Sequence, residues 1–147
     1  MVTRWYRAPE VMLNQMHYTE ALDVWSIGCI FGELMMRATL FQGQHNMKQL
    51  DKIVEVLGFP SEEDLSFISS EHSLNYLKRL PRKTVPRWED KMPQANPLAI
   101  DLLQKMLSFS PEKRISVEEA IRHPYFKSFQ HLGAPPVSET RFDWSWD

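Results

Sequence analysis

The sequence predicts a mainly α-helical fold with long loops, and three observations support this fold class. Several segments of the 147-residue chain carry apolar residues at helical spacing. Helix-start and helix-stop signals border these segments, such as Gly58 with Pro60, and Asn96 with Pro97. No segment shows the sustained alternation of apolar and polar residues that would indicate a β-strand.

The longest apolar stretch, Ala21–Met36, predicts a central helix of the core. Its apolar residues occupy nearly every side, which is typical of a buried helix. Its 16 residues would span about 24 Å, so a core helix is favoured over a membrane span. Gly28 and Gly32 lie one turn apart, and they would let another backbone approach this helix closely.

Further helices are expected over residues 11–14, 47–57, 74–80, 97–107 and 117–122. Gly58 ends the second of these helices, and Asn96 caps the fourth. Ser116 and Glu119 match a capping box at the start of the last one. The four prolines between residues 81 and 97 indicate that this stretch is a loop.

The composition excludes several classes of protein. Hydrophobic residues make up 43 % and charged residues 24 %, which is typical of a globular domain and not of a disordered chain. The net charge of −2 argues against nucleic acid as a partner, and no apolar run is long enough to cross a membrane. A single cysteine excludes a disulfide framework and fits a reducing compartment, so we expect the cytoplasm, with the nucleus as a second location.

Residue spacing alone indicates no catalytic chemistry. The five glycines are scattered and form no phosphate-binding loop, and the five histidines have no metal-ligand spacing. Cys29 lies within the apolar stretch, where a buried, inert thiol is favoured over a nucleophile. We therefore expect no metal site and assign no activity from these features.

The octet TRWYRAPE at residues 3–10 changes this interpretation. Ala-Pro-Glu closes the activation segment of protein kinases, and the whole octet resembles the segment that follows the phosphorylated Thr-x-Tyr of mitogen-activated protein kinases. Residues 23–29 look like the opening of the central buried helix of kinases. Residues 113–115 and 123–126 look like the end of the kinase domain. These motifs occur in kinase order, and the resemblance extends to about Phe129.

The resemblance implies an incomplete kinase fold, namely the C-terminal helical lobe from the end of the activation segment onward. Residues 1–129 would be this partial kinase domain, in which residues 58–95 resemble the loop-rich insert of the family. Residues 130–147 would form an irregular C-terminal extension. Because the helix that precedes the central helix in kinases is not in this sequence, we expect one apolar side of residues 21–36 to be exposed.

The resemblance also implies a function. A complete kinase of this family uses ATP and magnesium to phosphorylate Ser or Thr before Pro in signal transduction. Its Gly-rich loop, β3 lysine, His-Arg-Asp loop and Asp-Phe-Gly motif are absent from this sequence, so we expect this chain alone to be inactive. The implied partners are protein substrates, an upstream dual-specificity kinase and phosphatases. The alternative is a non-catalytic binding module or decoy that docks kinase substrates or regulators.

The resemblance implies roles for several residues in a substrate-binding segment. Thr3 would support the catalytic aspartate, which lies outside this sequence. The pocket beside the phosphoacceptor, which accepts proline in this family, would be formed by Val2, Thr3, Arg4, Tyr6 and Arg7. Arg4 and Arg7 would also pair with the phosphotyrosine of the activation loop, because a planar guanidinium meets phosphate oxygens with two hydrogen bonds. A turn hydroxyl and two surface arginines are the simpler alternatives.

Two further sets of residues follow from the resemblance. Glu10 and Arg114 would form a buried ion pair that anchors the activation segment, Asp23 would accept backbone hydrogen bonds from the catalytic loop, and Trp25 would be structural. A hydrophobic docking pocket for Phe-x-Phe peptides would be lined by Met12, Leu13, Asn46, Met47, Leu50 and Tyr76. Core packing is the alternative for this second set. The acidic docking cluster of the family has no counterpart in residues 131–136.

Overall fold

The computed structural model describes residues 4–13, 19–82, 84–85, 87–133, 138 and 140. Helices and loops make up these residues, and none of them lies in a strand, as the sequence predicts. The elements in chain order are α1 (Pro9–Met12), α2 (Ala21–Met36), α3 (Asn46–Leu57), the 3-10 helix η1 (Glu63–Leu65), α4 (Glu71–Lys78), α5 (Trp88–Lys91), α6 (Pro97–Met106), η2 (Pro111–Lys113), α7 (Val117–Ile121) and η3 (Pro124–Leu132).

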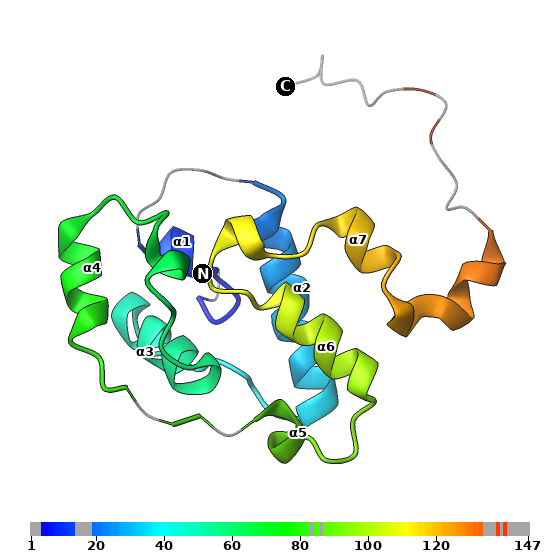
Figure 1. Cartoon of the computed structure of the whole chain (residues 1–147), viewed down its shortest axis with the longest axis horizontal. Coiled ribbons are helices and arrows are strands. Elements are labelled where there is room, and N and C mark those ends of the chain that lie inside the picture. Colours follow the sequence, from blue (N-terminus) through cyan, green and yellow to red (C-terminus); the bar gives the residue numbers. More distant parts are fainter. Residues whose placement is uncertain are drawn as a thin grey trace.

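Helices α2 and α6 pack against each other at the centre of the fold (Figure 1). The two glycines of α2 face this contact. A Cβ atom on Gly28 would lie 3.0 Å from side-chain atoms of Met106 and Leu107, and one on Gly32 would lie 3.3 Å from Leu103. The glycines do admit a close approach, but the atoms that approach them belong to side chains and not to the second backbone that the sequence predicts.

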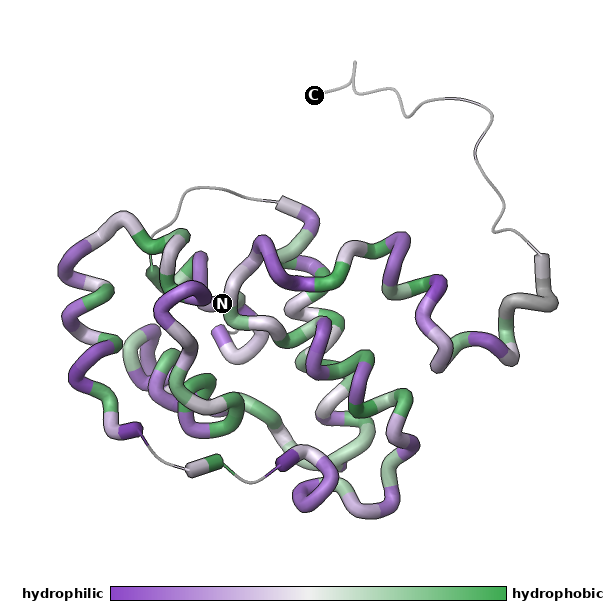
Figure 2. Tube along the Cα trace, viewed as in Figure 1, coloured by the Kyte–Doolittle hydropathy of each residue, from purple (hydrophilic) through white to green (hydrophobic). Residues whose placement is uncertain are grey.

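The main hydrophobic core lies between α2, α3 and α6. Its largest fully buried side chains are Trp25, Phe41, Leu50, Ile53, Leu77 and Leu103. A smaller cluster around Val24 and Leu102 packs against Phe31 and Tyr125, and thereby attaches η3. Figure 2 shows both hydrophobic and hydrophilic residues along α3 and along α4, as expected of helices with one buried face.

One side of α2 faces outward. Ile27, Ile30 and Leu34 are 53 %, 50 % and 72 % exposed, and their spacing of three and four residues places them on one face of the helix. We call these three residues the apolar stripe of α2. The expected exposed apolar side is therefore confirmed. The helix is buried on the face that carries Trp25 and the two glycines, and not on every side.

The predicted capping signals are present at three helix ends. Asn96 accepts a hydrogen bond from the Leu98 amide at the start of α6. Ser116 and Glu119 form the reciprocal bonds of a capping box at the start of α7. Gly58, with φ of 95°, ends α3 in a conformation that favours glycine. These local signals therefore predicted the ends of the helices correctly.

Two short helices begin earlier than the sequence predicts. Helix α1 starts at Pro9 instead of residue 11, because the ring of proline suits the first helical position. Helix α4 starts at Glu71 instead of residue 74, because the Ser70 side chain accepts a hydrogen bond from the Ser73 amide. Both differences come from start signals that lie just before the apolar pattern.

Helix α5 lies inside the stretch that the sequence predicts to be a loop. Trp88 is buried in the main core, and Lys91 donates a 2.8 Å hydrogen bond to the Val56 carbonyl at the end of α3. Burial lowers the pKa of Lys91. Contacts with distant residues therefore stabilise this turn of helix. The sequence predicts a loop here because four prolines lie between residues 81 and 97.

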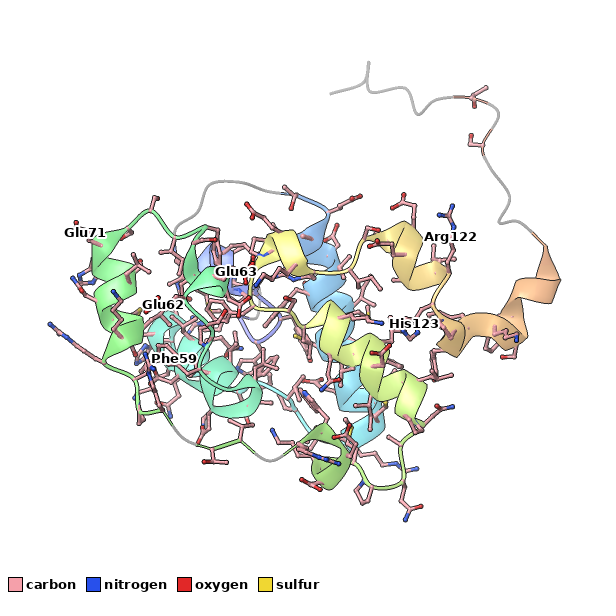
Figure 3. The ribbon with its side chains drawn as sticks, viewed as in Figure 1. Phe59, Glu62, Glu63, Glu71, Arg122 and His123 are labelled. Atoms are coloured by element: carbon pink, nitrogen blue, oxygen red, sulfur yellow. The ribbon has the colours of Figure 1, made fainter. Side chains whose placement is uncertain are left out.

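His123 connects η3 to the centre of the fold. It lies at the junction of α7 and η3 (Figure 3), and it is buried. Its Nε2 is 2.7 Å from Oδ2 of Asp101 on α6, and its Nδ1 accepts a hydrogen bond from the Tyr125 amide. Hydrogen bonds from Lys105 and His123 hold the pKa of Asp101 below its usual value. Both ring nitrogens of His123 are therefore engaged within the fold.

The α2–α6 contact gives a first testable prediction. Leu103→Ala removes a side chain that is 0 % exposed and that faces Gly32, so we expect the free energy of unfolding to fall by about 2–5 kcal/mol. Leu98→Ala, on the same helix at a position that is 41 % exposed, should change it by about 0.5 kcal/mol. Urea unfolding followed by circular dichroism measures both, and equal effects would contradict this packing.

Candidate functional site

The segment of residues 4–8 lies against α2 through hydrogen bonds to Tyr6. The hydroxyl of Tyr6 donates to Oε2 of Glu33 at 3.0 Å, and the Ser26 hydroxyl donates to the Tyr6 carbonyl at 3.0 Å. The other oxygen of Glu33 accepts from the Leu40 amide. The bond to Glu33 raises the pKa of Tyr6. Both ends of Tyr6 are therefore held by side chains of one rigid helix.

The preceding residues of the segment contact the chain just before α3. The Arg4 guanidinium donates to the Gln44 carbonyl, and the Trp5 indole donates to the Gly43 carbonyl at 3.2 Å. The segment is consequently fastened on two sides, by α2 and by residues 43–44. Val2 and Thr3, which the resemblance assigns to the same pocket, lie outside the described residues.

Glu10 and Arg114 form a bidentate ion pair at the end of this segment. Nη1 and Nη2 of Arg114 lie 2.7 and 3.0 Å from the two carboxylate oxygens of Glu10. The side chain of Arg114 is 0 % exposed and that of Glu10 is 3 % exposed. The remaining guanidinium hydrogen bonds go to the carbonyls of Ala21 and Ser108. All five donors of the guanidinium thus have acceptors, which a buried arginine requires.

Trp25 supports this ion pair from α2. The Arg114 guanidinium carbon lies 5.0 Å from the centre of the Trp25 ring, in a cation–π arrangement. The same ring stacks on Phe41 at 5.7 Å. Asp23 is exposed in the first turn of α2, and no hydrogen bond to its carboxylate comes from the described part of the chain. The expected contacts of Asp23 with a catalytic loop stay a prediction.

The six residues expected to line a docking pocket divide into two groups. Met12, Leu13 and Leu50 are buried in the main core, as the core-packing alternative holds. Asn46 is exposed at the start of α3, Met47 is half-buried, and the Tyr76 hydroxyl lies near the Met47 carbonyl. Only this second group offers surface to a peptide, and the pocket itself stays a prediction.

A cavity of about 400 Å³ lies beside Tyr76, between α3 and α4. It is lined by Lys48, Asp51, Val54, Glu55, Tyr76, Leu80 and Pro81, so it shares only Tyr76 with the predicted docking residues. The Tyr76 hydroxyl donates a 2.6 Å hydrogen bond to Asp51. Burial and this bond raise the pKa of Tyr76 to about 12. Burial opposes ionisation of Asp51, but bonds from Tyr76 and Lys48 outweigh it and lower the pKa of Asp51.

Three residues that hold the segment were not identified from the sequence. Ser26 and Glu33 contact Tyr6 from α2, and the buried Gln49 of α3 donates a 2.9 Å hydrogen bond to the Trp5 carbonyl. A signal existed for Gln49, which lies four residues before Ile53 and thus on the apolar side of α3. A polar residue on that side requires a buried hydrogen-bond partner.

The sequence model of the protein kinase domain matches residues 1–126. The chain belongs to the protein kinase family. It is 44 % identical over 147 residues to mitogen-activated protein kinase 13 of Arabidopsis thaliana, and 46 % identical over 147 residues to mitogen-activated protein kinase 1 of Oryza sativa subsp. japonica. Both matches cover the whole chain, but only 40 % and 37 % of the two relatives. The chain therefore spans about two fifths of the length of these kinases.

The kinase relationship agrees with the helical fold and with the resemblance to the mitogen-activated group. The segment of residues 4–8 runs into the Ala-Pro-Glu motif and so resembles the end of the kinase activation segment. Across the described ranges, none of the helices combines the length and hydropathy that crossing a bilayer requires. The matched region ends inside η3, within a few residues of the end that the sequence predicts.

The ion pair of this kinase segment gives a second prediction. Glu10→Gln leaves the Arg114 charge buried without its counter-ion, so we expect a loss of about 3 kcal/mol in the free energy of unfolding. The matched control is Lys52→Gln, which breaks a pair with Glu55 whose side chains are both 49 % exposed. It should cost less than about 1 kcal/mol. Chemical denaturation separates the two, and a small effect of Glu10→Gln would contradict the anchoring role.

The hydrogen bond between Tyr76 and Asp51 gives a third prediction. Ionising Tyr76 places a second negative charge beside the Asp51 carboxylate, so the phenol should titrate near pH 12. In Asp51→Asn the titration should move toward the ordinary tyrosine value of about 10. Difference absorbance of the phenolate between the variants isolates this group. Glu62→Gln, at an exposed site before η1, should leave the curve unchanged; the same curve in Asp51→Asn would contradict the contact.

Proposed function

We propose that this chain is the substrate-recognition part of a Ser/Thr protein kinase of the mitogen-activated type. The complete kinase would phosphorylate Ser or Thr that is followed by Pro in signal transduction. The observation that carries this proposal is the segment of residues 4–8, which α2 and the chain before α3 hold from two sides. The identity to two mitogen-activated protein kinases over the whole chain supports it.

The proposed mechanism of this part is positioning. The substrate would lie along residues 2–7, with the proline after the phosphoacceptor against Tyr6 and its neighbours. Because rigid helices hold the segment, the acceptor hydroxyl would be presented in one geometry, which lowers the entropic cost of the reaction. Thr3 would support the catalytic aspartate that other parts of the kinase provide. Each of these roles acts on the protein substrate and not on the nucleotide.

We also propose that Arg4 and Arg7 bind the phosphotyrosine of the activation loop. One nitrogen of the Arg4 guanidinium donates to the Gln44 carbonyl, and a guanidinium has five donors in all. The remaining donors of Arg4 could therefore meet a phosphate while the first bond holds the side chain in place. Arg7 is half-buried two residues before α1, close to the anchored end of the segment.

ATP and magnesium serve the complete kinase, and the residues of this chain do not fit them. The sequence contains no Gly-rich phosphate loop. Among the residues that the structure describes, no group of three His, Cys, Asp or Glu side chains is placed to hold a metal ion. We therefore propose that this chain alone does not transfer phosphate, and we derive no step through the nucleotide.

The proposal includes the partners and location expected of the family. They are protein substrates, an upstream dual-specificity kinase, phosphatases, and the cytoplasm and nucleus. We do not extend it to a separate docking module, because a peptide bound at Met12, Leu13 and Leu50 would have to replace core packing. The half-exposed residues Met47 and Tyr76 could still contact a substrate outside the main site.

A chimaeric kinase tests the proposal. This chain is joined to the part of the Arabidopsis relative that precedes its matching segment, and the product is phosphorylated by an active dual-specificity kinase. We expect phosphorylation of a Ser-Pro peptide to exceed that of the matched Ser-Ala peptide by about tenfold or more in kcat/KM. The 147-residue chain by itself, tested with Mg²⁺-ATP and the same peptides, is the control and should show no transfer.

Two results would contradict this proposal. A folded chimaera that phosphorylates both peptides equally would show that the segment does not recognise proline. Phosphate transfer by the chain alone would show that the nucleotide site lies within these 147 residues. Binding of Phe-x-Phe peptides without any preference for Ser-Pro peptides would favour the binding-module alternative.

A further inference from the structure

Gln49 is the one fully buried amide side chain in the described core, with 0 % exposure. Its Nε2 donates hydrogen bonds to the Trp5 carbonyl at 2.9 Å and to the Phe41 carbonyl at 3.0 Å. Its Oε1 accepts from the Gly43 amide at 2.7 Å. Both donors and the acceptor of this amide are used, so it forms a complete polar junction inside an apolar core.

This junction joins Trp5 to the start of α3, 44 residues later in the sequence, and to the residues that lead into that helix. Gln49 lies in the first turns of α3, residues 41–43 lead into that helix, and Trp5 belongs to the proposed substrate-binding segment. The Trp5 indole returns a hydrogen bond to the Gly43 carbonyl. The main chain and the side chain of Trp5 are therefore both bonded to the same small unit.

Gly43 is required for this close arrangement. A Cβ atom at this position would lie 2.3 Å from the Gln49 Cα and 2.4 Å from the Gln49 nitrogen, both of which are backbone atoms. No side chain can occupy that space without moving the start of α3. Gly43 therefore allows the close approach, and the Gln49 amide forms hydrogen bonds with the backbone groups around it.

We infer that Gln49 is a positioning residue for substrate recognition, because its amide fixes the main chain of Trp5 between Arg4 and Tyr6. This inference rests on the function proposed above for that segment. Residues on α2 hold Tyr6 from the other side, so loss of the Gln49 bonds should loosen the side of the segment that carries Arg4 and leave the anchored end at Glu10 in place.

Simple filling of the core does not explain Gln49. An unbranched apolar side chain could occupy the same volume, but it would leave two buried carbonyls and one buried amide without partners. The apolar neighbours on this face of α3, Leu50 and Ile53, already fill the core beside it. The polar group is therefore needed for the three backbone groups that it holds.

The test uses the full 147-residue chain with Gln49→Met, which keeps the length of the side chain, and Gln49→Glu, which keeps the acceptor for Gly43 but loses both donors. Gln104→Met, at an exposed position of α6, is the matched control. Amide hydrogen exchange is measured at Gly43 and at Arg7, whose amide donates to the Arg4 carbonyl. The Leu107 amide at the end of α6 is the internal reference.

We expect exchange at Arg7 to become about tenfold faster in both Gln49 variants, while exchange at Leu107 is unchanged. At Gly43 the same increase is expected in Gln49→Met, and a smaller one in Gln49→Glu. The affinity for a Ser-Pro peptide should fall in parallel. Gln104→Met should match the unaltered chain in every measurement.

Unchanged exchange at Arg7 in the folded variants would overturn the inference. Loss of cooperative melting in both variants would also overturn it, because Gln49 would then be a general requirement of the fold. The exchange measurement does not depend on substrate. One outcome is that the unaltered chain binds no Ser-Pro peptide while exchange at the Arg7 amide still becomes faster in the Gln49 variants. In that case the proposed function fails, but the junction between Gln49 and Trp5 stands.

Discussion

The rest of this structure depends on the hydrogen bonds and the ion pair of the buried Arg114 guanidinium. Its five hydrogen bonds reach Glu10 in α1, Ala21 at the start of α2, and Ser108 after α6, and its flat face lies on Trp25. These groups are up to 104 residues away in the sequence. A buried charge stays in place only when such partners surround it, so the arginine forces these distant segments into one arrangement.

The helices behind the segment of residues 4–8 hold it in place. Before α1 it forms neither a helix nor a strand, and its turn is closed by the Arg7 amide, which donates to the Arg4 carbonyl. Glu33 and Ser26 hold Tyr6 from α2, while Gln49 holds Trp5 from α3. Three helix-borne polar side chains therefore hold this segment through its backbone or through the Tyr6 phenol. This division is common where a rigid scaffold positions a functional loop.

The sequence predicted the helices best where local chemistry decides them. Asn96 and the Ser116 capping box marked helix starts correctly, because a cap acts on the residues next to it. Helix α5 was missed because Trp88 is held by the distant core and not by its neighbours. Leu50, which the resemblance assigns to a docking pocket, is buried in the core by the packing of α3, and the pocket stays a prediction.

By itself, the sequence determined the helical class, the close approach at Gly28 and Gly32, and the kinase family. Helical periodicity, capping residues and the order of the kinase motifs can all be read from the sequence without coordinates. Only the tertiary structure decided which side chains hold the segment of residues 4–8. The junction at Gln49 depends on which distant segments pack together, and burial, unlike helical periodicity, is a property of the whole fold.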